Sequence, residues 1–300
     1  MTIRIVTDST SDISQADAEK LGITVVPLNI HFGSEQLRDG VDILPQRFFE
    51  RLVDSKALPK TSQPSAGAFL EVYQRLAQET DQILSVHISG KLSGTINSAR
   101  AARDALGPRA RVEVLDAETV SWPLGLAARA AHEAAENGAG MEECIARAKD
   151  ALERTQLVFV LDTLEYLQKG GRIGRARAWI GQVFNIKPIL TIRDGEIAPL
   201  ERVRSRMRAE ERIFELATAD ADPELLAVAH SSSPDEAARW VQRLRDTRPG
   251  VPVEMGWLGP VVGVYAGPNV LGMATVRRTA SAAESDEAAE PERGAEAGTA

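Results

Sequence analysis

Cysteine, aromatic residues and long apolar runs are all scarce in this chain of 300 residues. Cys144 is the single cysteine, which excludes a disulfide framework and a cysteine-based metal site. No run of ~18 apolar residues occurs, so the sequence predicts no transmembrane helix. An acidic residue, Asp8, follows the start too closely for a typical secretory signal. We therefore expect a protein of the reducing cytoplasm.

A strong excess of one charge is also missing from most of the chain. The net charge is −8, but residues 279–300 hold six acidic side chains and one arginine, which leaves −3 for residues 1–278. This near neutrality predicts neither nucleic-acid binding nor attraction to an anionic membrane. The segment 279–300 has no Leu, Ile, Val or aromatic residue. We expect it to be a disordered acidic tail, because it cannot bury apolar surface.

Hydrophobic residues, by contrast, make up 43% of the sequence, enough for a large core of Ala, Val, Leu and Ile. Residues 1–155 repeat the order strand, polar loop, helix. That order is typical of an α/β domain with a mostly parallel sheet and helices on both faces. Residues 156–278 predict a smaller α+β domain with a hairpin over 188–203, turning at Asp194-Gly195. The sequence thus predicts two domains of the α/β class.

Three element boundaries rest on composition more than on periodicity. The β-branched run at 23–30 predicts one strand, and the similar run at 261–266 predicts the last strand of the chain. Residues 178–184 predict a short helix after a basic loop.

Two hydroxyl-rich loops precede predicted helices in the first domain. Thr61 and Ser62 open one of them, and Ser93, Gly94 and Thr95 close the other. A helix N-terminus carries partial positive charge and free N–H groups, so a carboxylate or phosphate fits there without a lysine or arginine. Serine and threonine are also the preferred N-caps whatever the function. The pattern alone leaves anion binding and simple capping both open.

Asp8 and Asp12 flank the end of the first predicted strand. Two carboxylates at that place could hold Mg²⁺ in a phosphotransferase, or could cap the following turn and helix. No Walker lysine motif accompanies them. The segment 90–94 reads Gly-x-x-Ser-Gly, which is not the spacing of a hydrolase nucleophile elbow.

Two basic runs lie in the second half of the chain. They comprise Lys169, Arg172, Arg175 and Arg177, and then Arg202, Arg204, Arg206 and Arg208. A solvated basic face and a docking surface for an acidic or nucleotide-bearing protein are both open. Nucleic-acid binding is disfavoured, because no aromatic platform accompanies the arginines.

Several motifs in this order and spacing resemble those of the DegV family over residues 3–275. They are V-T-D-S-T-S-D (6–12), T-S-Q-P-S (61–65), S-G-K-L-S-G-T (89–95), L-E-Y-L-Q-K-G-G-R-I-G (164–174), N-I-K-P-I-L (185–190) and D-G-E-I-A-P (194–199). The resemblance implies a two-domain α/β protein that holds one long-chain fatty acid, its chain buried in a tunnel and its carboxyl group held by hydroxyls. It further implies presentation of that fatty acid to a separate ATP-dependent fatty acid kinase.

The resemblance assigns the hydroxyls of Thr61 and Ser93 to the carboxyl group. Members of the family commonly carry a His-Thr-Gly-Pro-Gly-like segment whose histidine joins this carboxyl network. Here Tyr265 stands at the position of that histidine. A phenol can donate a hydrogen bond to a carboxylate, but simple packing of Tyr265 in the last strand is the alternative. Arg172 and Arg204 fall within matching segments, and we expect them to contact the kinase or its ATP.

The sequence therefore predicts a lipid-binding protein that is not itself a catalyst and needs neither cofactor nor metal. One alternative is a carrier of another amphipathic carboxylic acid. The other is a Mg²⁺-dependent phosphotransferase that uses Asp8 and Asp12.

Overall fold

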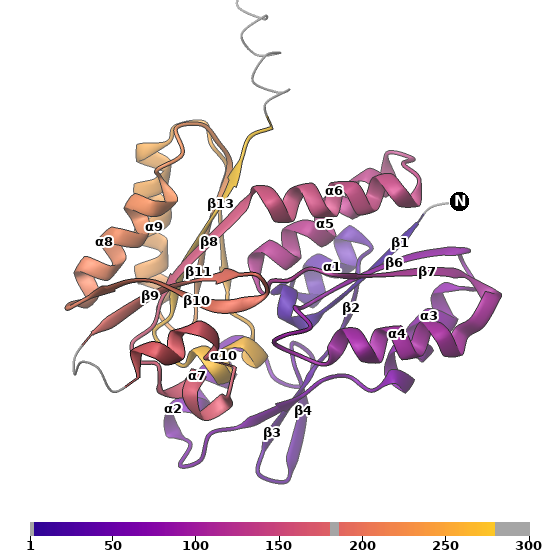
Figure 1. Cartoon of the computed structure of the whole chain (residues 1–300), viewed down its shortest axis with the longest axis horizontal. Helices are drawn as coiled ribbons and strands as arrows, with labels where there is room; N and C mark the ends of the chain where they lie inside the picture. The colour runs from indigo at the N-terminus through magenta and orange to yellow at the C-terminus, as the bar shows by residue number, and fades with distance from the viewer. Residues whose placement is uncertain (1–2, 181–185, 280–300) are drawn as a thin grey trace, which may run out of the picture.

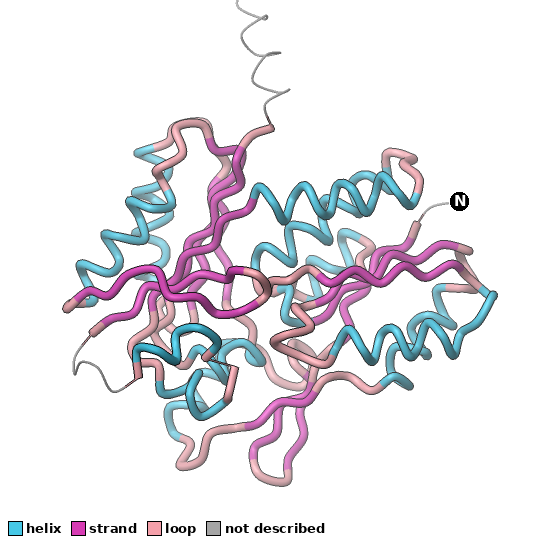
Figure 2. Tube along the Cα trace, in the orientation of Figure 1, coloured by secondary structure: helices cyan, strands magenta, loops and turns pink. Residues whose placement is uncertain are grey.

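The computed structural model of the chain describes residues 3–180 and 186–279. Their strands form a four-stranded, a six-stranded and a three-stranded sheet (Figure 1). The two larger sheets lie side by side, and the small sheet lies below them in the view of Figure 2. This mixed arrangement confirms the predicted α/β class.

The four-stranded sheet is wholly parallel, in the order β2-β1-β6-β7. Helices cover both of its faces, as the sequence predicts: α5 and α6 lie on one side, and α3 and α4 on the other (Figure 1). The elements are β1 (Arg4–Asp8), α1 (Gln15–Leu21), β2 (Thr24–Val26), α3 (Ala66–Leu76), β6 (Gln82–His87), α4 (Thr95–Leu106), β7 (Arg111–Asp116), α5 (Trp122–Glu136) and α6 (Met141–Arg154).

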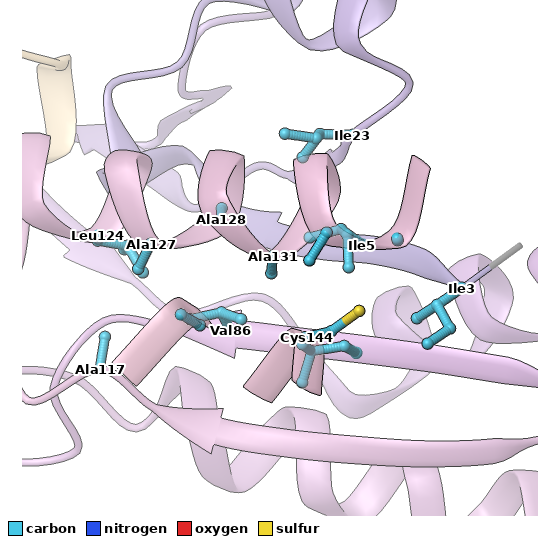
Figure 3. Close-up of a cluster of buried hydrophobic side chains, with 14 of the residues drawn as sticks. Ile3, Ile5, Ile23, Val86, Ala117, Leu124, Ala127, Ala128, Ala131 and Cys144 are labelled. Atoms are coloured by element: carbon cyan, nitrogen blue, oxygen red, sulfur yellow. The ribbon is translucent and has the colours of Figure 1, made fainter. Parts of the chain in front are cut away.

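The core beneath α5 and α6 contains many alanines and no aromatic residue among its buried side chains. Leu124, Ala127 and Ala131 of α5 are fully buried against Ile5 and Val86 of the sheet (Figure 3). Small side chains let a helix approach a sheet closely, so a chain that is only 5% aromatic still packs a continuous core.

The six-stranded sheet is mixed, in the order β10-β9-β8-β13-β11-β12, with only the pair β11–β12 parallel. Helices α8 and α9 cover one of its faces (Figure 1). The elements are β8 (Thr155–Val160), β9 (Lys187–Arg193), β10 (Glu196–Val203), α8 (Arg206–Ala217), β11 (Pro223–His230), α9 (Pro234–Thr247), β12 (Val253–Trp257) and β13 (Leu271–Arg277).

The three-stranded sheet β4-β3-β5 comes from the first half of the chain but packs with helices of the second half. Gly263 of α10, for example, lies where an added Cβ would be 2.6 Å from Phe49 of α2. The elements are β3 (Asn29–Phe32), β4 (Glu35–Arg38), α2 (Pro45–Asp54), β5 (Lys60–Ser62), α7 (Glu165–Gly170) and α10 (Pro260–Ala266); short 3₁₀ helices span Ser9–Ser11, Gly107–Arg109 and Gly174–Trp179.

The hairpin predicted over 188–203 is confirmed as β9 and β10, and its turn residues Asp194 and Gly195 both have positive φ, 52° and 75°. The strand predicted at 261–266 is wrong, because those residues form α10. Gly259 at the N-cap and Pro260 at the first helical position start that helix, and they outweigh its β-branched composition.

The run 23–30 is also not one strand, because it divides between β2 in the parallel sheet and β3 in the small sheet. The helix predicted over 178–184 reaches into residues 181–185, outside the described part of the chain, and Ala178 and Trp179 end a 3₁₀ helix. Residues 280–300 of the predicted tail lie outside it as well.

The domain boundary near residue 155 stays a prediction. The parallel sheet takes its strands from residues before 117 and the six-stranded sheet from residue 155 onward. The second sheet is the larger of the two, although the sequence predicts a smaller second domain.

Candidate functional site

A cavity of about 330 Å³ lies between the carboxyl ends of the parallel strands and the free face of the six-stranded sheet. Its size falls within the range of small-molecule sites, roughly 300–1,000 Å³. The carboxyl edge of a parallel sheet is the expected place for a ligand in such folds. Two walls of different chemistry enclose the cavity.

The sheet wall is apolar and comes from neighbouring strands of the six-stranded sheet. Phe159, Gly272 and Ala229 are cross-strand partners on β8, β13 and β11, so these three positions lie on one face, where Gly272 leaves space. Val158 and Val228 alternate with them and point to the helices on the opposite face. The sheet wall consists of Leu157, Phe159, Leu161, Ile192, Ala229 and Gly272.

The hydroxyl wall consists of Thr61, Ser62, Ser93 and Tyr265, all of which line the cavity. The Thr61 hydroxyl and the Tyr265 phenol share a hydrogen bond of 2.5 Å, although 204 residues separate them in the sequence. Ser62 Oγ lies 3.0 Å from Nε2 of His31 on the neighbouring strand β3. Residues 61 and 62 belong to β5 rather than to a loop.

The loop at 89–95 supplies the remaining hydroxyl of this wall. Ser93 Oγ lies 2.8 Å from Oγ1 of Thr95 and accepts the backbone N–H of Thr95 at 3.3 Å. Gly94 is the N-cap of α4, and a Cβ there would be 2.2 Å from the Gln63 amide. An added Cβ would make the Gln63 side chain move, so the two hydroxyl-bearing segments approach each other closely at this position.

Capping and cavity lining therefore coexist in these segments. Ser65 caps α3 by accepting the N–H of Ala68 at 3.1 Å, whereas Thr61 and Ser62 lie upstream of the cap and line the cavity. Thr95 is fully buried as the first residue of α4 and does not line the cavity.

Arg172 is exposed and also lines the cavity, so it lies at the cavity rim, and its expected role in docking a partner stays a prediction. Its Nε donates to the carbonyl of Leu92 at 3.2 Å, and its Nη1 donates to the carbonyl of Gly170 at 3.1 Å. The guanidinium also lies over the Tyr265 ring, 4.9 Å from the ring centroid. Arg172 thus ties the loop before Ser93 to the phenol of the hydroxyl wall.

Gly170 makes room for this arrangement. A Cβ at that position would lie 2.3 Å from Cδ1 of Tyr265, so any other residue would displace the phenol ring. In the sequence, Gly170 is one glycine of a glycine-rich basic loop. Its role in making room for Tyr265 follows only from the structure.

The remaining basic residues of the two runs differ in whether they form ion pairs. Lys169, Arg175 and Arg206 form ion pairs with Glu165, Asp194 and Glu210, respectively. Arg204 is exposed, and no ion pair involves it within residues 3–180 and 186–279.

Asp8 belongs to a buried hydrogen-bond network behind the cavity. One of its oxygens accepts Oγ1 of Thr10 at 2.5 Å, and the other lies 2.9 Å from Nδ1 of His87. His87 Nε2 continues to Ser85 Oγ at 2.7 Å. Thr10 lines the cavity, and the sequence marked it only as part of a polar loop at a strand end. Both oxygens of Asp8 are thus hydrogen-bonded, and Asp8 holds Thr10 in its position at the cavity.

Asp12 and a second carboxyl group, Asp39, hold the N-terminus of α10. Asp12 accepts the N–H of Gly259 at 2.8 Å, and Asp39 accepts that of Val261 at 3.4 Å. Burial raises the pKa of Asp12 to about 7 and that of Asp39 to about 8, against the opposing effect of hydrogen bonds to each carboxyl group. Ser121, which lines the cavity, also bonds to Asp12.

These contacts give no support to a magnesium site at Asp8 and Asp12. A carboxyl group that is part-protonated near pH 7 and bonded to a helix N-terminus is a poor ligand for Mg²⁺. Within residues 3–180 and 186–279, no group of three or more His, Cys, Asp or Glu side chains is placed to hold a metal ion. The helices in those ranges are too short or too polar to span a bilayer.

Comparison with known proteins identifies the family of this chain. The family model described as "Uncharacterised protein, DegV family" matches residues 2–278. A DegV domain-containing protein of Streptomyces coelicolor is 38% identical over 281 residues, which cover 92% of this chain and 99% of that protein.

Solved structures show the same fold. A DegV family protein from Thermus thermophilus, described by its fatty acid binding, is 34% identical with a TM-score of 0.84, over 93% of this chain and all of that one (100%). DegV from Bacillus subtilis, described as a fatty acid binding protein, is 32% identical with a TM-score of 0.86, over 93% and 100% of the two chains. The family resemblance of the motifs is thus confirmed, and this chain belongs to the DegV family.

Proposed function

We propose that this protein binds one long-chain fatty acid, with the acyl chain along the sheet wall and the carboxyl group at the hydroxyl wall. The observation that carries the proposal is the meeting of these two walls in one cavity. Its structural relatives from T. thermophilus and B. subtilis are described as fatty acid binding proteins.

Burial of the chain supplies most of the binding free energy. Each methylene group moved from water to an apolar site contributes ~0.8 kcal/mol, so a C16 chain offers on the order of 10 kcal/mol. Leu157 and Phe159 alternate along β8, and Leu161 follows directly after its end; together they give that chain a continuous apolar surface.

The carboxyl group then needs hydrogen bonds and orientation more than an ion pair. Thr61 and Tyr265 already face each other at 2.5 Å, so one carboxylate oxygen can accept from both hydroxyls after a small rearrangement. Tyr265 fills the role that the family resemblance gives to histidine. Arg172, over the phenol ring, adds positive charge beside the carboxylate.

The bound fatty acid is presented to a separate ATP-dependent kinase, and this chain carries no catalytic group of its own. Hydroxyl donors leave carboxylate lone pairs available for attack on a phosphoryl group, whereas a bidentate arginine would engage both oxygens. Exposed Arg204 suits contact with the kinase or its nucleotide, because charge on a rim accelerates association.

Native mass spectrometry of the freshly purified full chain tests the proposal. The expected result is a retained mass equal to one long-chain fatty acid, which denaturation releases for identification. A retained acid of another class, such as an isoprenoid acid, would support the alternative carrier. Retention of no lipid, together with Mg²⁺-dependent nucleotide turnover by the isolated chain, would contradict the proposal.

A further inference from the structure

The fatty acid cavity has two ends along the sheet wall. Leu161 lies at one end, in an apolar cluster that includes residues of α7 and of α10, the helix that carries Tyr265. Leu157 lies at the other end, four residues earlier in the chain, which corresponds to roughly 13 Å along an extended segment. A fatty acid held by its carboxyl group at the hydroxyl wall would therefore point its methyl end toward Leu157.

Beside Leu157 the same face of the sheet continues with two small residues. Ala274 on β13 is the cross-strand partner of Leu157, and Ala227 on β11 is the partner of Ala274. Both alanines are buried, but neither lines the cavity. Trp122 packs on this row of three residues. Its indole thus covers the part of the sheet face into which the cavity could otherwise extend.

The start of α5 places Trp122 at this end of the cavity. Val120 and Ser121 line the cavity, and Trp122 follows them as the first residue of the helix. Gly256 on β12 leaves space for the indole, because a Cβ there would lie 2.8 Å from its Cζ2 atom. The indole Nε1 is buried and has no hydrogen-bond partner among the residues that the structure describes. A buried donor without an acceptor opposes folding, so a hydrogen bond is not the reason for a tryptophan at this position.

A second pocket, of about 370 Å³, also borders Trp122; we call it the side pocket. It lies between α1, α5 and the edge strand β12. Its charged side chains are largely paired with one another, since Arg129 contacts Glu254 at 2.8 Å and Lys20 contacts Asp17 at 3.4 Å. The surface that remains is mainly apolar and comprises Ile13, Leu21, Leu126 and Met255. The side pocket therefore suits the methyl end of a chain better than a charged ligand.

We propose that Trp122 sets the upper limit of chain length, because its indole closes the cavity opposite the hydroxyl wall and separates it from the side pocket. The proposal rests on the function proposed above, since it needs an acyl chain along the sheet wall. Acids whose methyl end stops at Leu157 fit the closed cavity, and longer chains meet the indole. Trp122 is thus a specificity-determining residue that a role in core packing alone would not require.

The affinities of palmitate and of docosanoate, which is six carbons longer, provide the test on the delipidated full chain. Wild-type protein should bind docosanoate more weakly than palmitate, although extra methylene groups would strengthen binding if there were room for them. In W122A the ratio of the two affinities should shift toward docosanoate by at least about tenfold, the equivalent of two more buried methylene groups. W122F keeps a smaller ring and should shift the ratio in the same direction by less.

Trp240 on α9 provides the matched control. It is a partly buried tryptophan that packs against Phe214 on the opposite face of the same sheet, with ring centroids 5.5 Å apart. W240A should therefore leave the ratio of the two affinities unchanged. Because the readout is a ratio within one variant, a general loss of affinity in W122A does not imitate the expected result.

The possible results separate this proposal from the proposed function. If wild-type protein binds no fatty acid of either length, the proposed function is wrong. If it binds palmitate and binds docosanoate as tightly, the cavity is not closed at Leu157 and the proposal for Trp122 is wrong. That proposal is also wrong if W122A, or W122F where W122A does not fold, keeps the wild-type ratio. An equal shift in W240A would show a general loosening of the fold and would overturn it as well.

Discussion

The two walls of the cavity differ in how the fold builds them. The sheet wall comes from adjacent strands whose backbone hydrogen bonds fix every side chain in register. The hydroxyl wall gathers residues from β5, the loop at 89–95 and α10, and side-chain contacts between distant segments hold it together. A wall built on a sheet keeps its backbone position when one side chain changes, whereas the position of a wall built on tertiary contacts depends on each of those contacts.

Because of this difference, the two walls have different roles in binding under the proposed function. In the proposed complex, affinity comes from apolar area, which the sheet wall provides, and orientation comes from a few hydrogen bonds, which the hydroxyl wall provides. Changes in the sheet wall should therefore alter which chain binds, and changes in the hydroxyl wall should alter how well any carboxyl group binds.

Filling the sheet wall should give the largest effect. Ala229→Phe places a ring in the cavity and should displace about five methylene groups, a cost of about 4 kcal/mol. That cost equals about a thousandfold increase in the Kd of palmitate, measurable by displacement of a fluorescent fatty acid. Decanoate, six carbons shorter, should bind the variant within about threefold of wild type. Equal losses for both acids would indicate a damaged fold instead of a shortened cavity.

Removing hydroxyls should weaken all chain lengths alike. Ser93→Ala or Thr61→Ala should each cost roughly 1–3 kcal/mol in palmitate binding, because the buried carboxylate loses a donor. The double variant should lose less than the sum, since both hydroxyls serve one carboxyl group. Unchanged melting temperatures are the control for folding. Wild-type affinity in both single variants would reduce these hydroxyls to structural roles.

The stability of α10, which carries Tyr265 of the hydroxyl wall, should also depend on pH through the two carboxyl groups at its start. Asp12 and Asp39 have folded-state pKa values of about 7 and about 8, above those of an unfolded chain near 4. The folded state therefore binds more protons, and the stability from these groups is full below pH 4 and is lost as pH rises through 7 to 8.

Urea unfolding at pH 5.5 and pH 8.5 measures this loss. The free energy of unfolding should fall by at least about 1.4 kcal/mol, the equivalent of one pKa unit, from the contribution of Asp12 and Asp39. Asp39→Asn keeps an uncharged acceptor for the N–H of Val261 and should flatten the dependence. If the unfolding free energy of the variant changes between the two pH values as much as that of wild type, Asp39 is not the group responsible for the pH dependence.

Local sequence predicted what local contacts determine. The hairpin β9–β10 follows from Asp194-Gly195, whose positive φ angles suit a tight turn. The helix α10 differs from the predicted strand although Gly259 and Pro260 beside it are a local helix-start signal. The β-branched run 261–266 favours a strand, and the partners of the first helical N–H groups, Asp12 and Asp39, lie 247 and 222 residues away, where a local window does not reach.

The same reasoning applies to the candidate site. Thr61 and Ser93 were found through family motifs that stay intact in the sequence, and the cavity brings both to one wall. The charge of Arg172 is visible in the sequence, and its side chain is exposed, as that charge suggests. Its contact with Leu92, 80 residues away, which brings it to the cavity as well, is not visible there.

Substitution of Arg172 or Arg204 should give the smallest changes in lipid binding. Arg172→Ala removes the contact with Tyr265 and the tie to Leu92, and should weaken palmitate binding about two- to fivefold, given ~0.5–1 kcal/mol for a cation–π contact at an exposed site. Arg204→Ala should leave palmitate affinity unchanged, because Arg204 is exposed and does not line the cavity.

Kinase-coupled acyl phosphate formation on the same preparations then separates the two arginines. Arg204→Ala should lower turnover at low salt, and the difference from wild type should narrow as ionic strength screens the rim charge. Arg172→Ala should lower turnover at subsaturating palmitate and recover part of it when palmitate saturates the cavity. If Arg204→Ala loses lipid together with turnover, Arg204 supports the fold and the docking role is wrong. If it keeps full turnover at low salt, the basic face around it is merely solvated.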